Sequence, residues 1–244
     1  MKKYRLVADQ VDWRDQYYNY AKCSLQESVD MRSMASGIQS QRELGSCTAQ
    51  AIVSAYEILL KNEHPDKFVD LSPLFVYYNS RYVEGTINED AGAYLRDALK
   101  AVDHYGICEE SAWPYDINKF TFRPPPEAYQ NAKKYRIKRY KRLSNLDNIL
   151  DSLSSRHPVV TGIMVYSGFE RITGENPVLP MPSDTDTELG AHAILLVGYD
   201  LSKQQVLAQN SFGSTWGQNG YFWIPFDYIN QELTDAWIFD ILLN

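Results

Sequence analysis

Apolar residues in the first half of the chain recur at the spacing of amphipathic α-helices. The stretch from Cys47 to about Asn62 places four apolar side chains on one face: Ile52, Tyr56, Leu59 and Leu60. A second helix is predicted after Asp90, from four apolar residues at the same spacing: Leu95, Ala98, Leu99 and Val102. Gly106 ends this pattern, as glycine often does at a helix C-terminus. The first half is therefore predicted to be mostly helical.

The second half of the chain changes to short runs of β-branched and aromatic residues. Such runs, bounded by glycine, proline or polar residues, predict four strands: 159–166, 192–199, 205–211 and 220–226. The sequence 123-RPPP-126 marks a crossover between two lobes, and 173–190 reads as a long loop rich in proline and acidic residues. We therefore predict an α+β fold with a helical lobe, about 40–122, and a β-rich lobe, about 123–230.

The bulk composition allows a sizeable core and narrows the partners. The 244 residues include 44% hydrophobic and 23% charged residues, which is ordinary for a globular protein. With 24 basic and 31 acidic residues the net charge is −7, so the chain as a whole does not attract nucleic acid or anionic membranes. No apolar stretch approaches the roughly 18 to 20 residues that span a bilayer. We expect no nucleic-acid partner, no membrane partner and a monomer.

The N-terminal sequence and the cysteines bear on location. MKKYRLVADQVDWRDQYYNY has two lysines but lacks the apolar core of a secretory signal. Three cysteines are an odd number in a chain too large to depend on disulfides, and Cys23 and Cys108 are expected to be free thiols. Four histidines without ligand-spaced neighbours predict no zinc site. We expect a cytoplasmic protein with no metal and no organic cofactor, and export by a non-classical route stays open.

Cys47 is singled out by its surroundings in 41-QRELGSCTAQ-50, where a Gly-Ser step precedes it and a predicted helix begins at it. By residue type alone, a single cysteine is more often a small buried hydrophobe than a nucleophile. Other residues favour the nucleophile. His192 stands at the start of an apolar strand in 189-LGAHAILLVGYD-200, and Asn210 ends another strand before a turn rich in glycine and tryptophan.

Thiol catalysis needs these residue types. A thiol is mostly protonated at neutral pH and requires a partner that stabilises its thiolate. A helix N-terminus contributes partial positive charge, and an imidazolium contributes more. A side-chain amide such as that of Asn210 can orient the imidazole. Gln41 and the backbone N–H of Cys47 can stabilise the oxyanion that forms during attack on a carbonyl.

The chain resembles the papain family of cysteine peptidases in three separate motifs: QRELGSC at 41–47, GAH at 190–192 and NSFGSTWGQNGY at 210–221. His192 and Asn210 lie 145 and 163 residues after Cys47, near the family spacing of about 130 to 150. Residues 98–115 and Asp30-Met31-Arg32 resemble further family segments, so the resemblance covers roughly residues 30–225. It implies a papain-like two-lobed fold, with a cleft between a helical first lobe and a β-barrel-like second lobe.

The resemblance also implies a role for each matching residue. Cys47 would be the nucleophile and His192 the general base and acid. Asn210 would orient His192, and Gln41 would line the oxyanion hole. The resemblance further implies a set of substrate-binding residues: Gly92, Ala93, Tyr94, Leu95, Gly162, Ala193 and Trp216. Gly92 would pair with an extended substrate, and Trp216 would flank the leaving-group side.

Several positions depart from the family pattern. Thr48-Ala49-Gln50 stands where Trp-Ala-Phe is usual, and Phe212 replaces the tryptophan that shields the His–Asn hydrogen bond. Leu44 and Asp90 occupy the positions of a disulfide known from secreted members. These departures resemble the prokaryotic or viral branch of the family.

The first 29 residues form an extension before the peptidase domain at 30–244. Their length is short for a family propeptide. We expect this N-terminal arm to lie over or near the cleft and to limit access, with four aromatic anchors: Trp13, Tyr17, Tyr18 and Tyr20. The alternative is an arm that packs elsewhere and only stabilises the fold.

The leading functional prediction is a cysteine endopeptidase that binds peptides or proteins in extended conformation and forms a Cys47 thioester. A thiol amidase or acyltransferase with the same residues is one alternative, and a non-catalytic peptide-binding protein is another. The basic run 133-KKYRIKRYKR-142 favours a solvated connecting strand over a polyanion site, because the rest of the chain is acidic.

Overall fold

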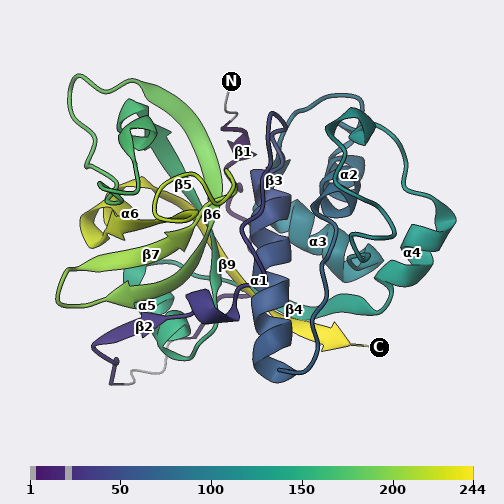
Figure 1. Cartoon of the computed structure of the whole chain (residues 1–244), viewed down its shortest axis with the longest axis horizontal. Coiled ribbons are helices and arrows are strands. Elements are labelled where there is room, and N and C mark those ends of the chain that lie inside the picture. Colours follow the sequence, from purple (N-terminus) through teal and green to yellow (C-terminus); the bar gives the residue numbers. More distant parts are fainter. Residues whose placement is uncertain (1–3, 20–23, 244) are drawn as a thin grey trace.

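A computed structural model describes residues 4–19 and 24–243 of the chain. Two lobes meet along helix α1 (Cys47–Glu63), which stands upright at the centre of Figure 1. A curled sheet makes up the left-hand lobe, and helices α2 (Pro73–Glu84) and α3 (Leu95–Tyr105) lie in the right-hand lobe. The observed α+β architecture is therefore the predicted one.

The two predicted helices of the first half are present, and their burial explains their roles. From Cys47 to Leu60 every residue of α1 is buried, so this helix is a central element and not the amphipathic surface helix that its pattern predicts. Helix α3 is amphipathic as expected and ends at Gly106, whose φ of 80° places it in the region that favours glycine. Within the described residues, no helix combines the length and apolarity needed to cross a bilayer.

Other helices are shorter. Helix α2 begins at Pro73, and Ser72 caps it by accepting a hydrogen bond from the backbone N–H of Phe75. The remaining helices are α4 (Pro126–Ala132), α5 (Leu146–Ser154), α6 (Phe226–Glu232) and the 3₁₀ turns Arg32–Met34, Ile117–Lys119 and Ser167–Arg171.

The strands form one curled sheet with two branches. Its main order is β3-β1-β6-β5-β9-β4, while β2 and β7 also pair with β6, and β8 pairs with β7. Their bounds are β1 (Leu6–Val7), β2 (Ser28–Asp30), β3 (Ala93–Tyr94), β4 (Tyr135–Arg142), β5 (Val159–Tyr166), β6 (Glu188–Asp200), β7 (Gln205–Gln209), β8 (Tyr221–Pro225) and β9 (Leu233–Leu243). Strands β5 to β8 match the four predicted runs, and β4 is the connecting strand predicted from the basic run.

Helix α2 and strand β9 are not predicted by the pattern, for the same physical reason. Both elements are buried on nearly all sides: residues 73–81 of α2 are buried, and so are residues 235–239 of β9. An element covered on every side has no polar face, so neither the helical nor the alternating period is visible in its sequence.

The described part of the N-terminal arm runs across the junction of the lobes. Strand β1 pairs in parallel with β3 of the helical lobe and antiparallel with β6 of the β-rich lobe. Leu6 lies opposite Ala93 on one side and Ala191 on the other. Figure 1 shows β1 between β6 and β3, near the upper end of α1.

The predicted anchors of the arm are only partly correct. Trp13 is 90% exposed, so it does not anchor the arm, and Tyr17 is 45% exposed. Tyr18 does hold the arm, because its hydroxyl donates to Asp151 Oδ2 at 2.5 Å. Tyr20 lies outside the described residues, as does Cys23. The aromatic residue that reaches the lobe junction is Tyr4, which the sequence does not single out.

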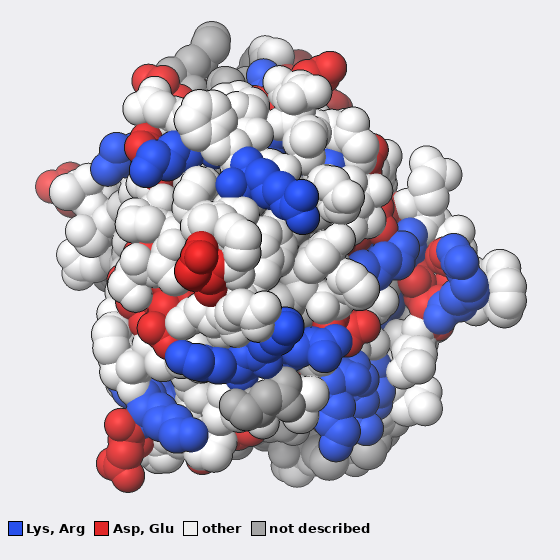
Figure 2. Space-filling model, turned by 90° about the vertical axis from the view of Figure 1, so that its right-hand side faces the viewer, with Lys and Arg blue, Asp and Glu red and all other residues white. Residues whose placement is uncertain are grey.

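Charges of both signs are interleaved on the side of the molecule that lies to the right in Figure 1. Figure 2 shows blue and red atoms next to one another over this face. Ion pairs join three cations of the basic run to acidic residues: Lys134–Glu109, Arg139–Asp240 and Arg142–Asp235. The run thus contributes to the fold through specific pairs.

Candidate active site

Cys47 is the first residue of α1 and lies at the junction of the two lobes. Its side chain is fully buried, and burial raises the pKa of the thiol. Hydrogen bonds from the backbone of Ala193, Arg5 and Thr48 act on this pKa in the opposite direction. The sulfur is therefore contacted from α1, from β6 and from the N-terminal arm.

His192 and Asn210 are joined by a buried hydrogen bond. The distance from His192 Nε2 to Asn210 Oδ1 is 2.8 Å. Asn210 Oδ1 also accepts the backbone N–H of Ser211 at 2.8 Å, which fixes this atom as the amide oxygen. His192 Nε2 must then donate, so Nδ1 is the imidazole nitrogen available for exchanging a proton with another group.

Strand β6 brings His192 to the cysteine. Ala193, the next residue along β6, contacts the Cys47 thiol through its backbone. Gly190, Ala191 and His192 pair with β5 in regular antiparallel register. The residue that follows His192 on β6 therefore lies against the thiol at the point where α1 begins.

Phe212 covers the hydrogen bond between His192 and Asn210. Its ring stacks on the imidazole with centroids 5.1 Å apart and an interplanar angle of 29°. An apolar ring in this place excludes water from the His–Asn hydrogen bond and strengthens it. The position that departs from the family tryptophan thus keeps an aromatic cover.

Gln41 is fully buried in the loop that leads to Cys47. Its Nε2 donates to the carbonyl oxygen of Leu44 at 2.8 Å, and its Oε1 accepts from Ser211 Oγ at 2.7 Å. Its backbone N–H donates to the Ser211 carbonyl at 2.9 Å. These bonds fix the orientation of the amide: its NH₂ group faces Leu44, in the loop that precedes Cys47, and its oxygen faces Ser211.

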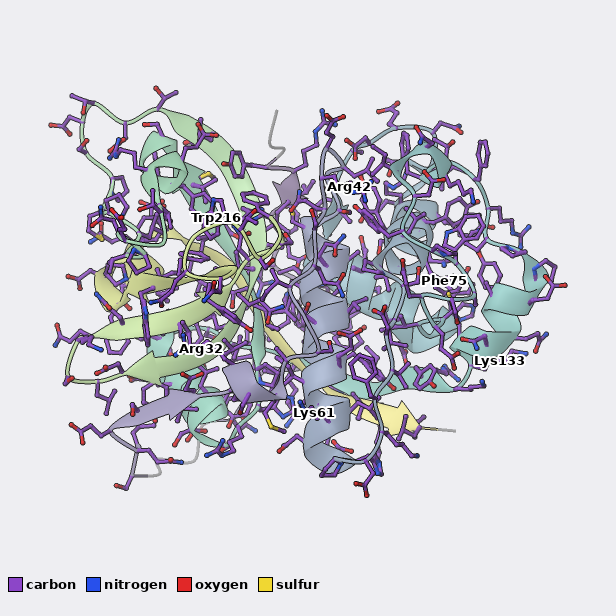
Figure 3. All side chains as sticks on the ribbon, in the orientation of Figure 1. Arg32, Arg42, Lys61, Phe75, Lys133 and Trp216 are labelled. Atoms are coloured by element: carbon purple, nitrogen blue, oxygen red, sulfur yellow. The ribbon has the colours of Figure 1, made fainter. Side chains whose placement is uncertain are left out.

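Trp216 belongs to an aromatic cluster beside the imidazole. Its ring stacks on Phe169 at 5.4 Å and meets Phe212 edge-on at 5.7 Å. Phe169 in turn contacts His192 at 5.7 Å, a contact that the sequence does not predict. Figure 3 shows Trp216 in the left-hand lobe and Arg42, from the loop before Cys47, across the junction near the top of α1.

The predicted substrate-binding residues are brought together around the N-terminal arm. A Cβ atom added to Gly92 would lie 1.7 Å from the carbonyl oxygen of Arg5, and one added to Gly162 would lie 2.3 Å from Leu6 Cδ2. Ala93 pairs with Leu6. The glycines thus leave room for an extended chain between the lobes, and residues 5 and 6 occupy that room.

The other predicted substrate-binding residues are more deeply placed. Ala193 is buried beside the Cys47 sulfur, and Leu95 is fully buried at the first turn of α3. Tyr94 is half-buried, and its backbone N–H donates to Glu84 Oε1 at 2.9 Å.

Asp90 is a site residue that the functional reading of the sequence misses. Its Oδ1 accepts the backbone N–H of Gly45 at 2.8 Å and the hydroxyl of Tyr77 at 2.5 Å. The carboxylate thereby ties the loop before Cys47 to the segment before Gly92. The sequence feature that could have identified Asp90 is its position, because it stands where secreted members of the family have a disulfide cysteine.

The site residues do not form a metal centre. Across residues 4–19 and 24–243, no group of three or more His, Cys, Asp and Glu side chains is arranged to hold a metal ion.

Comparison with known proteins agrees with this geometry. Residues 25–234 match the family described as "Papain family cysteine protease". A peptidase C1-like protein of Acanthamoeba polyphaga mimivirus is 37% identical over 210 residues, covering 81% of this chain and 68% of that protein. A cysteine protease of Blomia tropicalis is 25% identical, and this chain spans 61% of its length.

Solved structures agree as well. The cysteine protease xylellain from Xylella fastidiosa superposes with a TM-score of 0.89 at 32% identity, covering 98% of this chain and 97% of that one. Digestive procathepsin L 3 of Tenebrio molitor gives a TM-score of 0.75 at 22% identity, covering 97% of this chain and 76% of that one, and shows the shared fold.

The chain therefore belongs to the papain family of cysteine proteases. It is a cysteine peptidase, and its viral and bacterial relatives agree with the branch expected from the absent disulfide positions.

Proposed function

We propose that the protein is an endopeptidase that cleaves extended peptides through a thioester on Cys47. The observation that carries this proposal is the hydrogen bond from His192 Nε2 to Asn210 Oδ1. His192 belongs to strand β6, and the next residue of β6, Ala193, contacts the Cys47 sulfur through its backbone. Asn210 orients His192 through Nε2, so we assign the exchange of the thiol proton to Nδ1. An ion pair of thiolate and imidazolium at a helix N-terminus is an activated nucleophile.

The proposed reaction has two halves. The Cys47 sulfur attacks the peptide carbonyl carbon, and the imidazolium of His192 gives its proton to the amine nitrogen as the C–N bond breaks. Water then attacks the thioester while His192 takes a proton from it. The C–S bond breaks, the acid product leaves and the proton returns to the sulfur. Gln41 Nε2 and the backbone N–H of Cys47 stabilise the oxyanion in both halves.

We propose further that the N-terminal arm limits access to Cys47. Supporting this, Arg5 contacts the sulfur through its backbone and the Tyr4 ring lies against His192, with centroids 5.5 Å apart. The arm runs parallel to β3 and contributes to the burial of the thiol; burial raises the pKa of this thiol, while the backbone of Arg5 acts in the opposite direction. Departure of the arm would rehydrate the sulfur and favour its ionisation.

Two groups of polar contacts support this closed arrangement. Asp9 accepts from Trp237 Nε1 at 2.9 Å and from the backbone N–H of Arg96, and its own N–H donates to Asp235 Oδ2 at 3.0 Å. Asp15 receives Arg96 Nε at 2.9 Å and Arg142 at 3.2 Å. Two carboxylates of the arm are thereby held by the body of the protein.

The test is covalent labelling combined with cleavage. Full-length protein carrying Leu6→Glu, which disfavours the docked arm, is exposed to a peptidyl epoxide, and its intact mass is measured alongside cleavage of internally quenched peptides. We expect one adduct, lost in Cys47→Ala and kept in Cys108→Ala, since Cys108 is also buried but lies far from the site in sequence and fold. His192→Ala should lower cleavage by at least about 100-fold. Cleavage that persists in Cys47→Ala would refute the proposal. The cytoplasmic location and the monomeric state stay predictions.

A further inference from the structure

The side chain of Arg5 occupies a recess beside the Cys47 sulfur. It passes over Gly45, where an added Cβ atom would lie 2.9 Å from Arg5 Cδ and 3.0 Å from Arg5 Cβ. Arg5 Nη1 donates to the carbonyl oxygen of Asp90 and lies 4.0 Å from Asp90 Oδ2. Gly45 therefore forms the bottom of the recess, where the absence of a side chain leaves room for Arg5. The carboxylate of Asp90 lies at the far end of the recess.

The carboxylate at the end of the recess is held in one orientation. Oδ1 of Asp90 accepts from Gly45 and Tyr77, while Oδ2 is the oxygen on the side of Arg5. The Asp90 side chain is only 10% exposed, so its charge is less screened than that of a surface residue. Burial first, and the hydrogen bond to Asp90 second, raise the pKa of Tyr77, so its hydroxyl stays a donor to Oδ1.

The place of this recess relative to the sulfur identifies the substrate residue it would receive. A scissile carbonyl carbon must approach the sulfur to about 3–3.5 Å, and the side chain of the same residue starts one bond away from that carbon. The backbone of Arg5 contacts the sulfur, so its side chain starts where that substrate side chain would start. The two side chains start from the same place whichever direction the chain takes in the cleft.

We propose that Gly45 and Asp90 form a subsite selective for arginine or lysine in the substrate residue that supplies the scissile carbonyl. This inference rests on the proposed peptidase function. The carboxylate and the Asp90 carbonyl together offer acceptors to a guanidinium, which carries five donors and no acceptor. A neutral side chain forgoes the charge attraction to the carboxylate, and an acidic one is repelled by it.

The test compares substrates that differ only in this residue. Full-length protein carrying Leu6→Glu, which introduces a charge against Gly162 to release the arm, is given fluorogenic dipeptides ending in Leu-Arg, Leu-norleucine or Leu-Glu. Asp90→Asn keeps an acceptor for Gly45 and Tyr77 while removing the charge. We expect kcat/KM to favour arginine over norleucine, and Asp90→Asn to reduce this ratio about 10- to 100-fold. Asp184→Asn, in the exposed acidic loop, is the matched control and should leave the ratio unchanged.

Each outcome decides one of the two proposals. Cleavage without a preference for arginine, or a preference that survives Asp90→Asn, overturns the subsite and leaves the peptidase intact. If no dipeptide is cleaved, the proposed function fails, and the subsite is then judged by hydrogen exchange of residues 4–7 in the full chain without Leu6→Glu. Arg5→Gln and Asp90→Asn should each speed this exchange, and the double variant should add nothing further. Additive effects of the two substitutions would overturn the subsite.

Discussion

The ring of Tyr4 lies edge-on against the imidazole of His192, with centroids 5.5 Å apart and planes at 88°. The same ring contacts Phe169 at 5.9 Å and Phe212 at 6.2 Å. Tyr4 therefore completes an aromatic enclosure around the histidine that is otherwise built from the β-rich lobe. The arm and the catalytic residues are in direct contact, so their behaviour should be coupled.

Leu6→Glu should make Cys47 accessible. Leu6 is 6% exposed and its Cδ2 lies against Gly162, near Thr234 Oγ1, so the substitution would bury a charged carboxylate beside at most a neutral donor. We expect the rate of Cys47 alkylation by iodoacetamide to rise at least about tenfold, because burying an unpaired charge disfavours the docked arm. Intact mass against time gives the rate.

Val11→Glu is the matched control for this change. Val11 belongs to the same arm but is 85% exposed, so the substitution should not alter the alkylation rate. Equal rates for wild type and Leu6→Glu would contradict the proposal that the arm limits access.

The arm should bind more tightly as pH falls from 8 to 5. Burial first, and the neighbouring Asp235 second, raise the pKa of Asp9 from 3.8 to about 6, while Arg96 and Trp237 act in the opposite direction. A carboxyl whose pKa is raised on docking favours the docked state when protonated. This contribution is complete below pH 3.8 and is lost as pH rises through about 6. The population ratio of docked to free arm should therefore be about tenfold greater at pH 5 than at pH 8.

Hydrogen exchange of residues 4–9, corrected for the intrinsic pH dependence, measures this ratio. Asp9→Asn keeps the shape of the side chain and removes the titrating group, so its exchange protection should vary little over the same range. Protection that falls on acidification in the wild type would contradict the assignment to Asp9. Asp12→Asn is the matched control, because Asp12 pairs with Arg14 within the arm itself.

The sequence singles out Cys47, His192 and Asn210, the proposed catalytic residues, more readily than the contacts around them. Cys47 begins α1 and Asn210 directly follows β7, while His192 lies within β6 near the start of its apolar run, so motif and element can be read together. The contacts of Asp90 are different. They depend on two loops whose approach follows from packing of α1 against α2, and no periodicity in the sequence records that approach.

The arm shows the same limit. Its sequence has no period, and its most aromatic part, around Trp13, suggests the anchors. Of these anchors the structure uses Tyr18, and it adds the two-residue strand β1 and two carboxylates, because the cleft supplies strand partners and cations. These interactions depend on residues of the two lobes that contact the arm, so the sequence of the arm alone does not predict them.

Gln41→Ala should lower kcat more than it lowers stability. If Gln41 Nε2 stabilises the oxyanion, its removal costs about 10²–10³ in kcat. Removal also breaks the bonds to Leu44 and Ser211, which should reduce the free energy of unfolding by about 1–3 kcal/mol. Steady-state kinetics in the Leu6→Glu background and thermal denaturation measure the two effects.

Ser211→Ala separates these effects, because it removes the hydrogen bond to Gln41 Oε1 and leaves Nε2 in place. We expect it to lose stability with a much smaller loss of kcat. Gln231→Ala, at an exposed position on α6, should change neither quantity. Equal losses of kcat in Gln41→Ala and Ser211→Ala would argue that Gln41 only supports the loop.

Glu57→Gln should stabilise the protein at pH 8 and not at pH 5. Glu57 lies in α1 and is 4% exposed; it accepts from the backbone N–H of Leu71 at 2.9 Å and from Ser36 Oγ. Burial raises its pKa from 4.5 to about 7, despite the hydrogen bonds, which lower it. The folded state therefore favours the protonated carboxyl. Its contribution to stability is present below pH 4.5 and is lost as pH rises through about 7.

The glutamine is neutral at every pH and keeps the shape of the protonated side chain. We expect the free energy of unfolding of Glu57→Gln to exceed that of wild type by about 2 kcal/mol at pH 8 and to approach it at pH 5. Urea denaturation at both pH values measures the difference. Glu63→Gln, an exposed position at the end of the same helix, is the control and should follow wild type. A Glu57→Gln variant that is less stable than wild type at pH 8 would contradict this prediction. It would mean that the hydrogen bonds from Leu71 and Ser36 stabilise the ionised carboxylate of Glu57 by more than burial destabilises it.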